Sequence, residues 1–153
     1  MRAPRTNHCP APRPQGFTMI ELMTTLTVIA VLTAVVLPAY VYYLQRARIP
    51  EATGALAAKQ VAQEQLFQDS RSYFAPGTSA CSTSGMAGSS YFSYAFSACT
   101  ATSYVLAASG KAGTNMVGFT FTIDHNGNRA TTTVPNGWAP ASNCWVTAKG
   151  GRC

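Results

Sequence analysis

The stretch Gly16-Phe17-Thr18-Met19-Ile20-Glu21 and the apolar run that follows it, residues 22–44, decide how this chain is organised. The run contains no Lys, Arg, Asp, Glu or His, and Glu21 is the one acid at its front edge. A charge-free run of this length can cross a bilayer as a helix. The sequence therefore predicts a soluble domain that is attached to a membrane-spanning helix.

A basic leader, residues 1–15, precedes the run and holds four prolines and three arginines. It lacks apolar periodicity and is expected to be extended or disordered. An ordinary secretory signal places its apolar region before the cleavage site and loses it. Here Gly16 precedes the run, so a cut after Gly16 leaves the run on the mature chain. The positive leader is expected on the cytoplasmic side.

The leader also carries much of the charge. Eleven Lys and Arg residues against five Asp and Glu give a formal charge of +6, and three of the arginines lie before Phe17. After a cut at Gly16, eight basic residues face five acidic ones. The basic isoelectric point is therefore a weak argument for nucleic-acid binding.

Five cysteines are present, and one of them, Cys9, lies in the leader. The remaining four are Cys81, Cys99, Cys144 and Cys153. An even number in a small domain beyond a membrane segment predicts two disulfides in an oxidising compartment. Three pairings are possible, and pairing between sequence neighbours is favoured because each loop is short and turn-rich. Free thiols are less favoured, and so is zinc, since CxxC and HxxxH spacings do not occur.

The helix is predicted in two halves, a hydrophobic one over residues 17–44 and an amphipathic one over residues 45–70. The threonines of the first half can return their hydroxyls to the preceding turn. Pro38 removes a backbone donor, which predicts a kink or local unwinding. The exit toward water is marked by Tyr40, Tyr42, Tyr43, Arg46 and Arg48.

The second half shows apolar residues at spacings near three and four, which predicts a stripe that packs on the rest of the chain. The stripe consists of Ala52, Ala55, Leu56, Ala62, Leu66 and Phe67. The other side is filled by Lys59, Gln60, Gln63, Glu64 and Asp69.

Residues 71–153 are predicted as a globular β domain that begins with a long αβ loop, residues 71–90. Strands are expected at residues 91–97, 103–109, 117–123 and 129–134. Asn126-Gly127 is a strong hairpin signal. Phe119 and Phe121 are expected to face the helix and the intervening threonines to face water. An irregular tail is expected to follow, with Trp138 and Trp145 packed nearby. The fold class is α+β, with a roughly four-stranded antiparallel sheet.

The front end resembles the N-terminus of type IV pilins and related pseudopilins. The resemblance rests on residues 16–23, from Gly16-Phe17-Thr18 to Glu21-Leu22-Met23, and on Pro38-Ala39-Tyr40. The chain is most similar to a minor pilin of the type IV pilus. The resemblance implies cleavage between Gly16 and Phe17 by a prepilin peptidase and N-methylation of Phe17. It also implies that an inner-membrane assembly platform adds the subunit to other pilins, for adhesion, twitching motility or DNA uptake.

The resemblance also implies an assembly role for Glu21, and physical chemistry agrees. A carboxylate in lipid costs several kcal/mol, about 2.5 or more on lenient scales. No Lys or Arg lies within helical reach, so the α-amino group of Phe17, its own or a neighbour's, is a suitable partner. The alternative is that Glu21 sits near the headgroups at a helix N-terminus, where an acid is favoured. Pro38 is expected to be a weak point that filament packing exploits.

Other function classes are less well supported by the residues. His125 is a lone turn histidine, and nucleophile, phosphate-loop and metal spacings do not occur, so neither catalysis nor a cofactor is expected. A DNA-binding or surface-binding tip module is an alternative. Its residues would be Lys111, Arg129, Lys149 and Arg152 with Tyr104, Trp138 and Trp145. The more usual role of such residues is solvated charge and small-domain core.

Two further alternatives remain, a type II secretion pseudopilin and an anchored domain that never assembles. The expected location is the inner membrane, with the leader cytoplasmic and the domain periplasmic. An extracellular pilus filament is expected to follow.

Overall fold

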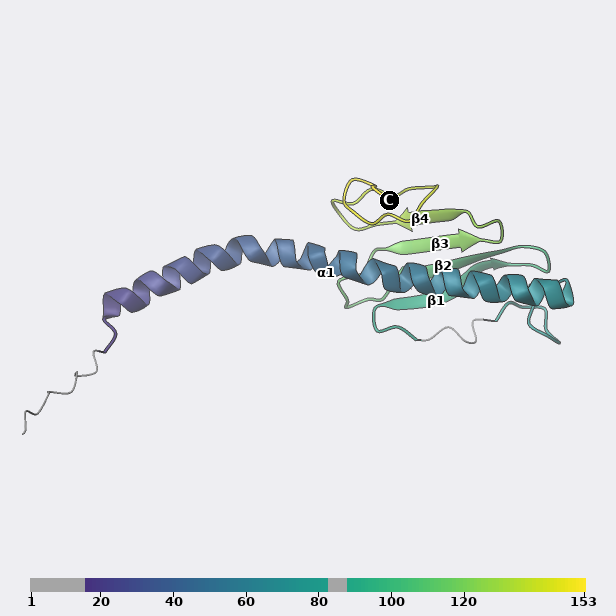
Figure 1. Ribbon diagram of the computed structural model, residues 1–153, viewed down its shortest axis with the longest axis horizontal. Coiled ribbons are helices and arrows are strands. Elements are labelled where there is room, and N and C mark those ends of the chain that lie inside the picture. The colour runs from purple at the N-terminus through teal and green to yellow at the C-terminus, as the bar shows by residue number, and fades with distance from the viewer. Residues whose placement is uncertain (1–15, 83–87) are drawn as a thin grey trace, which may run out of the picture. The chain divides into compact units, whose positions relative to one another are not determined.

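The computed structural model describes residues 16–82 and 88–153. The leader, residues 1–15, and residues 83–87 of the predicted αβ loop lie outside the described residues. The elements follow in the order α1 (Met19–Ser70), β1 (Phe92–Cys99), β2 (Tyr104–Gly110), β3 (Thr120–Asp124) and β4 (Arg129–Thr133) (Figure 1). This arrangement confirms the predicted α+β fold class.

The chain divides into two units, Met1–Pro38 and Ala39–Cys153, and each is described by itself. In the first unit, Thr18 caps α1, because its Oγ1 accepts a hydrogen bond from the Glu21 backbone N at 3.3 Å. Helical structure therefore begins at Met19 and not at Phe17. The hydroxyls of Thr24, Thr25, Thr27 and Thr33 donate to carbonyls of the preceding turn, as predicted.

The helix does not unwind at Pro38, since the described backbone is helical from Met19 to Ser70 without interruption. Of the two outcomes predicted at Pro38, a kink or local unwinding, the local unwinding does not occur. One missing donor in a long helix leaves the remaining backbone hydrogen bonds to hold the turn.

In the second unit the four strands form an antiparallel sheet in the order β1-β2-β3-β4. Leu106 in β2 pairs with Ile123 in β3, and Phe121 in β3 pairs with Thr131 in β4. The part of α1 after Ala39 runs along one face of this sheet (Figure 1). Along β2 and β3, buried side chains on that face alternate with half-buried side chains on the other face. This is the pattern expected of a sheet that is covered on one side.

The apolar core lies between α1 and the sheet. It includes Ile49, Ala52 and Leu56 from α1 and Phe92, Tyr104, Leu106, Ala108, Phe121 and Ile123 from the strands. Two loop residues, Met116 and Phe119, complete it together with Trp138 and Val146 from the C-terminal segment. The packing of both tryptophans near the tail agrees with the sequence prediction, since Trp145 is also packed against this cluster.

The predicted strand at residues 117–123 begins three residues too early. Val117 is 53% exposed, and Gly118 has a φ of 89°, which ordinary side chains rarely adopt. Phe119 is buried but lies outside β3, and its carbonyl accepts a hydrogen bond from the Gly110 backbone N at 2.9 Å. A turn therefore replaces the first part of the predicted alternation.

The predicted stripe on α1 is partly wrong. Ala62 is exposed, whereas Gln63, which the sequence assigned to the solvated side, is only 3% exposed. Buried positions at Ile49, Leu56 and Gln63 recur every seven residues, so they lie on one face of the helix. Ala62 lies about 100° around the helix from Gln63 and falls off that face.

Both disulfides join sequence neighbours, which is the pairing that the sequence favours. Cys81 is bonded to Cys99 and Cys144 to Cys153, with Cα atoms 6.0 Å apart in each pair. The first bond ties the loop after α1 to the end of β1. The second closes the C-terminal loop, residues 144–153, and Thr131 of β4 donates a hydrogen bond from its Oγ1 to the Cys144 carbonyl at 3.2 Å.

Candidate assembly and surface-contact sites

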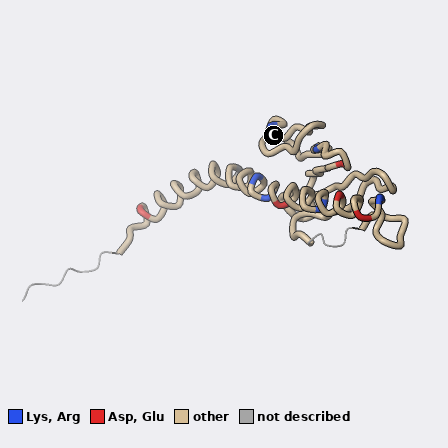
Figure 2. The backbone as a smooth tube through the Cα atoms, turned by 45° about the vertical axis from the view of Figure 1, so that its right-hand side comes forward, with Lys and Arg blue, Asp and Glu red and all other residues tan. Residues whose placement is uncertain are grey.

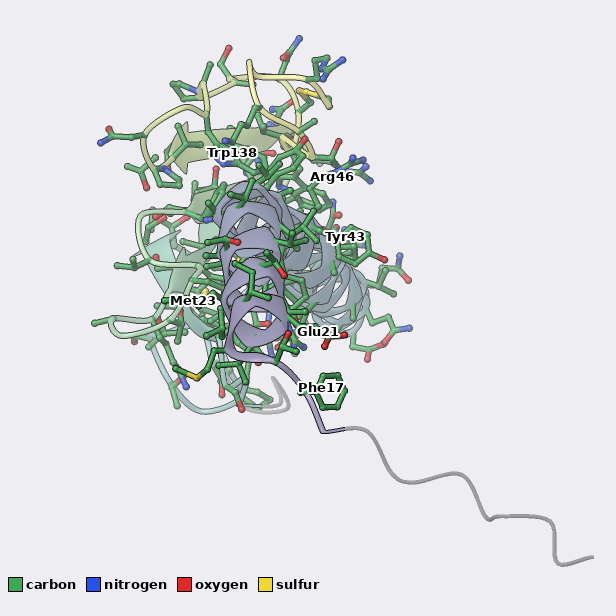
Figure 3. All side chains as sticks on the ribbon, turned by 90° about the vertical axis from the view of Figure 1, so that its left-hand side faces the viewer. Phe17, Glu21, Met23, Tyr43, Arg46 and Trp138 are labelled. Carbon is green, nitrogen blue, oxygen red and sulfur yellow. A yellow bond between two sulfur atoms is a disulfide. The ribbon has the colours of Figure 1, made fainter. Side chains whose placement is uncertain are left out.

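The predicted processing position lies at the start of the described chain. Gly16 and Phe17 precede α1, and both are exposed, Phe17 by 86%. A peptide bond outside regular secondary structure is accessible to an enzyme without unfolding a helix. Figure 3 shows Phe17 and Glu21 projecting outward from the beginning of α1.

Glu21 lies in the first turn of α1 and is exposed. The sequence holds no Lys or Arg between Arg13 and Arg46. Around Glu21 the large apolar side chains from Met19 to Leu37 are each more than half exposed, for example Val35 at 72%. A helix segment that is apolar on all sides requires lipid or other helices around it. This segment is long and apolar enough to cross a membrane.

The basic and aromatic residues that the sequence grouped into one patch do not form one. Tyr104 is 0% exposed and Trp138 8%, because both belong to the core, so neither presents a ring face to a ligand. The strand register separates the cations. Arg129 pairs with Ile123 near the β3–β4 turn, whereas Lys111 follows the opposite end of β2.

The cations instead form separate pairs with aromatic rings. The Arg129 guanidinium lies 4.7 Å from the centre of the Trp145 ring, and the Trp145 Nε1 donates to the Thr122 carbonyl at 2.8 Å. Arg48 lies 4.0 Å from the Tyr91 ring centre. Each pair brings together residues far apart in sequence, so spacing alone could not reveal them.

A buried polar cluster links α1 to the sheet, and the sequence analysis missed it. The Glu64 carboxylate accepts hydrogen bonds from Tyr73 Oη at 3.1 Å and from Tyr104 Oη at 3.3 Å. His125 is half-buried, and its ring centre lies 6.4 Å from the centres of both tyrosine rings. His125 therefore lies in the turn after β3 with its ring close to the two tyrosines. The sequence analysis placed Glu64 on the solvated side of the helix. Its hydrogen-bond partners lie in other parts of the chain, so only the tertiary structure reveals them.

The same cluster shifts the tyrosine pKa values. Burial, and then the negative charge of Glu64, raises the pKa of Tyr104 well above its usual value of 10.0. Burial and the Glu64 hydrogen bond also raise the pKa of Tyr73. Both phenols therefore stay protonated and donate to Glu64 at neutral pH. Among residues 16–82 and 88–153, no three His, Cys, Asp or Glu side chains converge as a metal site would require.

The fold and the N-terminal segment define a class, the type IV pilins, and comparison with known proteins gives the family. The family model described as "Type IV minor pilin ComP, DNA uptake sequence receptor" matches residues 38–117. A second model, the prokaryotic N-terminal methylation motif, matches residues 12–37. The first match covers more than half of the chain, which therefore belongs to the ComP family of type IV minor pilins.

Individual relatives agree with the class of type IV pilins, and two of them are named as major pilins. The type IV major pilin protein PilA of Myxococcus xanthus (strain DK1622) is 36% identical over 73 residues, which are 48% of this chain and 31% of that protein. The type IV major alpha-pilin of Moraxella bovis is 42% identical over 48 residues, 31% of this chain and 30% of that protein. The chain thus matches about a third of the length of these curated relatives.

A solved structure supports the fold. The crystal structure of the Neisseria meningitidis non-core minor pilin PilV superposes with a TM-score of 0.53 at 16% identity, over 62% of this chain and 93% of that one. At this identity the likeness concerns the fold. Taken with the family models, it confirms the predicted resemblance. The chain is thus a type IV minor pilin by family, with an N-methylation motif ahead of a helix long and apolar enough to cross a membrane.

Proposed function

We propose that a prepilin peptidase cuts this minor pilin between Gly16 and Phe17 and that Phe17 is then N-methylated. The leader faces the cytoplasm and the domain, Ala39–Cys153, faces the periplasm until an inner-membrane platform adds the subunit to other pilins. The proposal is supported by the exposed Gly16–Phe17 peptide directly ahead of the capped helix start. The family match to a pilus protein favours this filament over a type II secretion pseudopilus.

The observation that carries the proposal is a lone carboxylate on a helix segment whose apolar side chains are exposed on all sides. In the filament, neighbouring helices cover these side chains and the Phe17 amine of one subunit neutralises Glu21 of another. A charge pair in an apolar environment is much stronger than in water, so it sets the axial register between subunits. Pro38 provides the place at which α1 yields as the helices pack, since it lacks a backbone donor.

Replacement of Glu21 by Gln tests this role. Glu21→Gln keeps the size of the side chain and the apolar helix, so membrane insertion is expected to be unchanged. Incorporation into sheared filaments is expected to fall at least about tenfold, the effect of losing roughly 1.4 kcal/mol of subunit contact. Asp69→Asn, which removes an exposed charge at the far end of α1, is the matched control. Normal filament incorporation of Glu21→Gln would contradict the proposal.

The domain is also proposed to contact DNA through the Arg129–Trp145 pair, together with the exposed Arg152 of the C-terminal loop. The Arg129 guanidinium lies over the half-buried Trp145 indole, and both arginines are exposed, so they can contact phosphate. Residues 125–153 contain no Asp or Glu. The support is the receptor description of the matched family, although that match ends at residue 117, before this surface.

Salt-dependent binding tests the DNA contact. The full chain in neutral detergent is titrated with duplex DNA at several salt concentrations, alone and as the double variant Arg129→Gln/Arg152→Gln. The loss of two phosphate contacts is expected to flatten the slope of log affinity against log salt by about two. Arg71→Gln, also at an exposed position, is the control. An unchanged slope in the double variant would exclude this surface.

A further inference from the structure

Four cations gather at one end of the domain, the end at which α1 comes in from Ala39. This proximal end is identified by Gln45, whose Nε2 donates to the Asn115 carbonyl at 3.0 Å, beyond the end of β2. The opposite, distal end holds Glu64 beside Tyr104, at the start of β2. The proximal cations are called the collar here and are Arg46, Arg48, Lys111 and Lys149.

Half of the collar is built on Tyr42. The Arg46 guanidinium lies 5.8 Å and the Lys149 ammonium 5.3 Å from the centre of the Tyr42 ring, and the ring of Trp138 packs 5.8 Å from it. Lys149 comes from the C-terminal loop that the Cys144–Cys153 disulfide closes. The fold therefore brings a cation from the end of the chain to the exit of the apolar helix.

The other half of the collar is built on Tyr91. Arg48 covers its ring at 4.0 Å, and the Lys111 backbone N donates to the Tyr91 carbonyl at 2.8 Å. The Lys111 ammonium donates to the Ser89 carbonyl. The carboxylate at this end is Glu51, which accepts a hydrogen bond from the Ser89 hydroxyl.

The two ends of the domain differ in charge balance (Figure 2). The collar sets four cations against Glu51. At the distal end the charged residues are Lys59, Arg71, Arg129, Glu64, Asp69 and Asp124, three of each sign. Arg152, in the C-terminal loop, is the remaining charge, so three of the four excess positive charges of the domain lie at the proximal end. Such an excess of positive charge favours an anionic partner at the proximal end.

The position of the collar along the chain identifies that partner. Residues 22–44 span about 35 Å as a helix at 1.5 Å per residue, close to the hydrocarbon thickness of a bilayer. Arg46 follows two residues later. Tyr40 and Tyr43, which are 57% and 70% exposed, occupy the headgroup level, where tyrosine rings are favoured.

We propose that the collar binds the phosphates of anionic phospholipid headgroups in the leaflet that faces the domain. Basic residues beside an anionic surface each add attraction, and the two on Tyr42 are also fixed in place by the ring. Because Lys149 belongs to the C-terminal loop, the contact holds the whole domain on the membrane before assembly. Extraction of the subunit into a filament then breaks it.

Lipid retention by the full chain tests this site. The chain in neutral detergent is titrated separately with phosphatidylglycerol and with phosphatidylcholine, and bound lipid is counted by native mass spectrometry. Wild type is expected to retain phosphatidylglycerol roughly tenfold more strongly than phosphatidylcholine. Arg46→Gln/Lys149→Gln is expected to lose that preference. Arg71→Gln/Arg129→Gln, with the same charge change at the distal end, is expected to keep it.

Several outcomes would overturn the proposal. One is equal retention of both lipids by the wild-type chain. Another is an equal effect of the two double variants, which would show that net charge alone determines lipid retention. Displacement of the lipid by an equal concentration of inorganic phosphate would indicate a free-anion site. If the collar variant lost duplex DNA binding but kept its preference for phosphatidylglycerol, the collar would be a nucleic-acid surface. Arg48→Gln/Lys111→Gln supplies a second collar variant, expected to weaken the preference in the same direction.

Discussion

At the scale of single residues, Glu64 joins α1 both to the segment after the helix and to the sheet. Its carboxylate accepts hydrogen bonds from the hydroxyl of Tyr73, in the segment after α1, and from the hydroxyl of Tyr104, in β2. Hydrogen bonds to a charged acceptor are about twice as strong as neutral ones. One residue therefore fixes the end of α1 against the sheet.

Glu64→Gln is expected to lower the free energy of unfolding of the domain by about 1.5–3 kcal/mol, because the charged acceptor of two phenols is lost. Thermal unfolding of the full chain, followed by near-ultraviolet circular dichroism, measures the change. Asp69→Asn, at an exposed position on the same end of α1, is expected to stay within about 0.5 kcal/mol of wild type. Equal effects of the two changes would show that Glu64 holds no special position.

Tyr104 of this cluster also predicts that the stability of the domain falls at alkaline pH. The folded-state pKa of Tyr104 is raised above 10.0 by burial and then by Glu64, so its stabilising contribution is present below pH 10 and is lost as the pH rises. The unfolded phenol ionises first and pulls the equilibrium toward unfolding. The melting temperature is expected to fall between about pH 9 and about pH 11, and less steeply in Tyr104→Phe. Parallel pH profiles for the two proteins would contradict this assignment.

At the scale of elements, the β3–β4 hairpin follows from its own sequence. Gly127 adopts a φ of 80°, and the Asp124 carboxylate accepts bonds from the backbone N of Asn126 and of Asn128 at 2.9 and 2.8 Å. Burial alone would raise the pKa of Asp124, but these hydrogen bonds outweigh it and lower the pKa. Such local chemistry is visible in the residues Asp124–Asn128 without any knowledge of the fold.

Other features could not be predicted, because contacts distant in sequence determine them. Gln63 is buried at a polar position of α1, and Phe119 fills the core from a turn and not from a strand. The apolar helix, the cysteine pairing and the turn Asn126-Gly127 depend on composition, spacing or local geometry, and they agree with the structure. The cation–ring pairs depend on the strand register and on the course of the C-terminal loop.

Gly110, at the end of β2, and Gly54, within α1, differ in whether the structure has space for a side chain, and replacing each by alanine tests this difference. A Cβ at Gly110 would collide with the Met116 backbone carbonyl, so Gly110→Ala is expected to destabilise the domain by about 1–3 kcal/mol. At Gly54 a Cβ meets open space within α1, and Gly54→Ala is expected to stabilise by about 0.5–1 kcal/mol. The melting temperatures of both variants provide the comparison. A shift of the same sign in both would contradict the predicted backbone clash.

At the scale of the whole molecule, the two units, Met1–Pro38 and Ala39–Cys153, are built for different environments. The described part of the first exposes apolar side chains on all sides, whereas the second has its own core and two disulfides. Neither lipid nor water alone suits both units. A subunit that first spans a membrane and later packs in a filament satisfies both, with the second unit in an oxidising compartment at each stage.

Mass spectrometry of sheared surface filaments tests the central claim most directly. Digestion with a protease that cuts after Arg is expected to yield a peptide that begins at Phe17 and ends at Arg46. Its mass is expected to include one N-methyl group at Phe17. Peptides from the leader are expected to be absent from the filament fraction. Detection of the chain in filaments with the leader attached, or its complete absence from them while the membrane fraction holds it, would contradict the account.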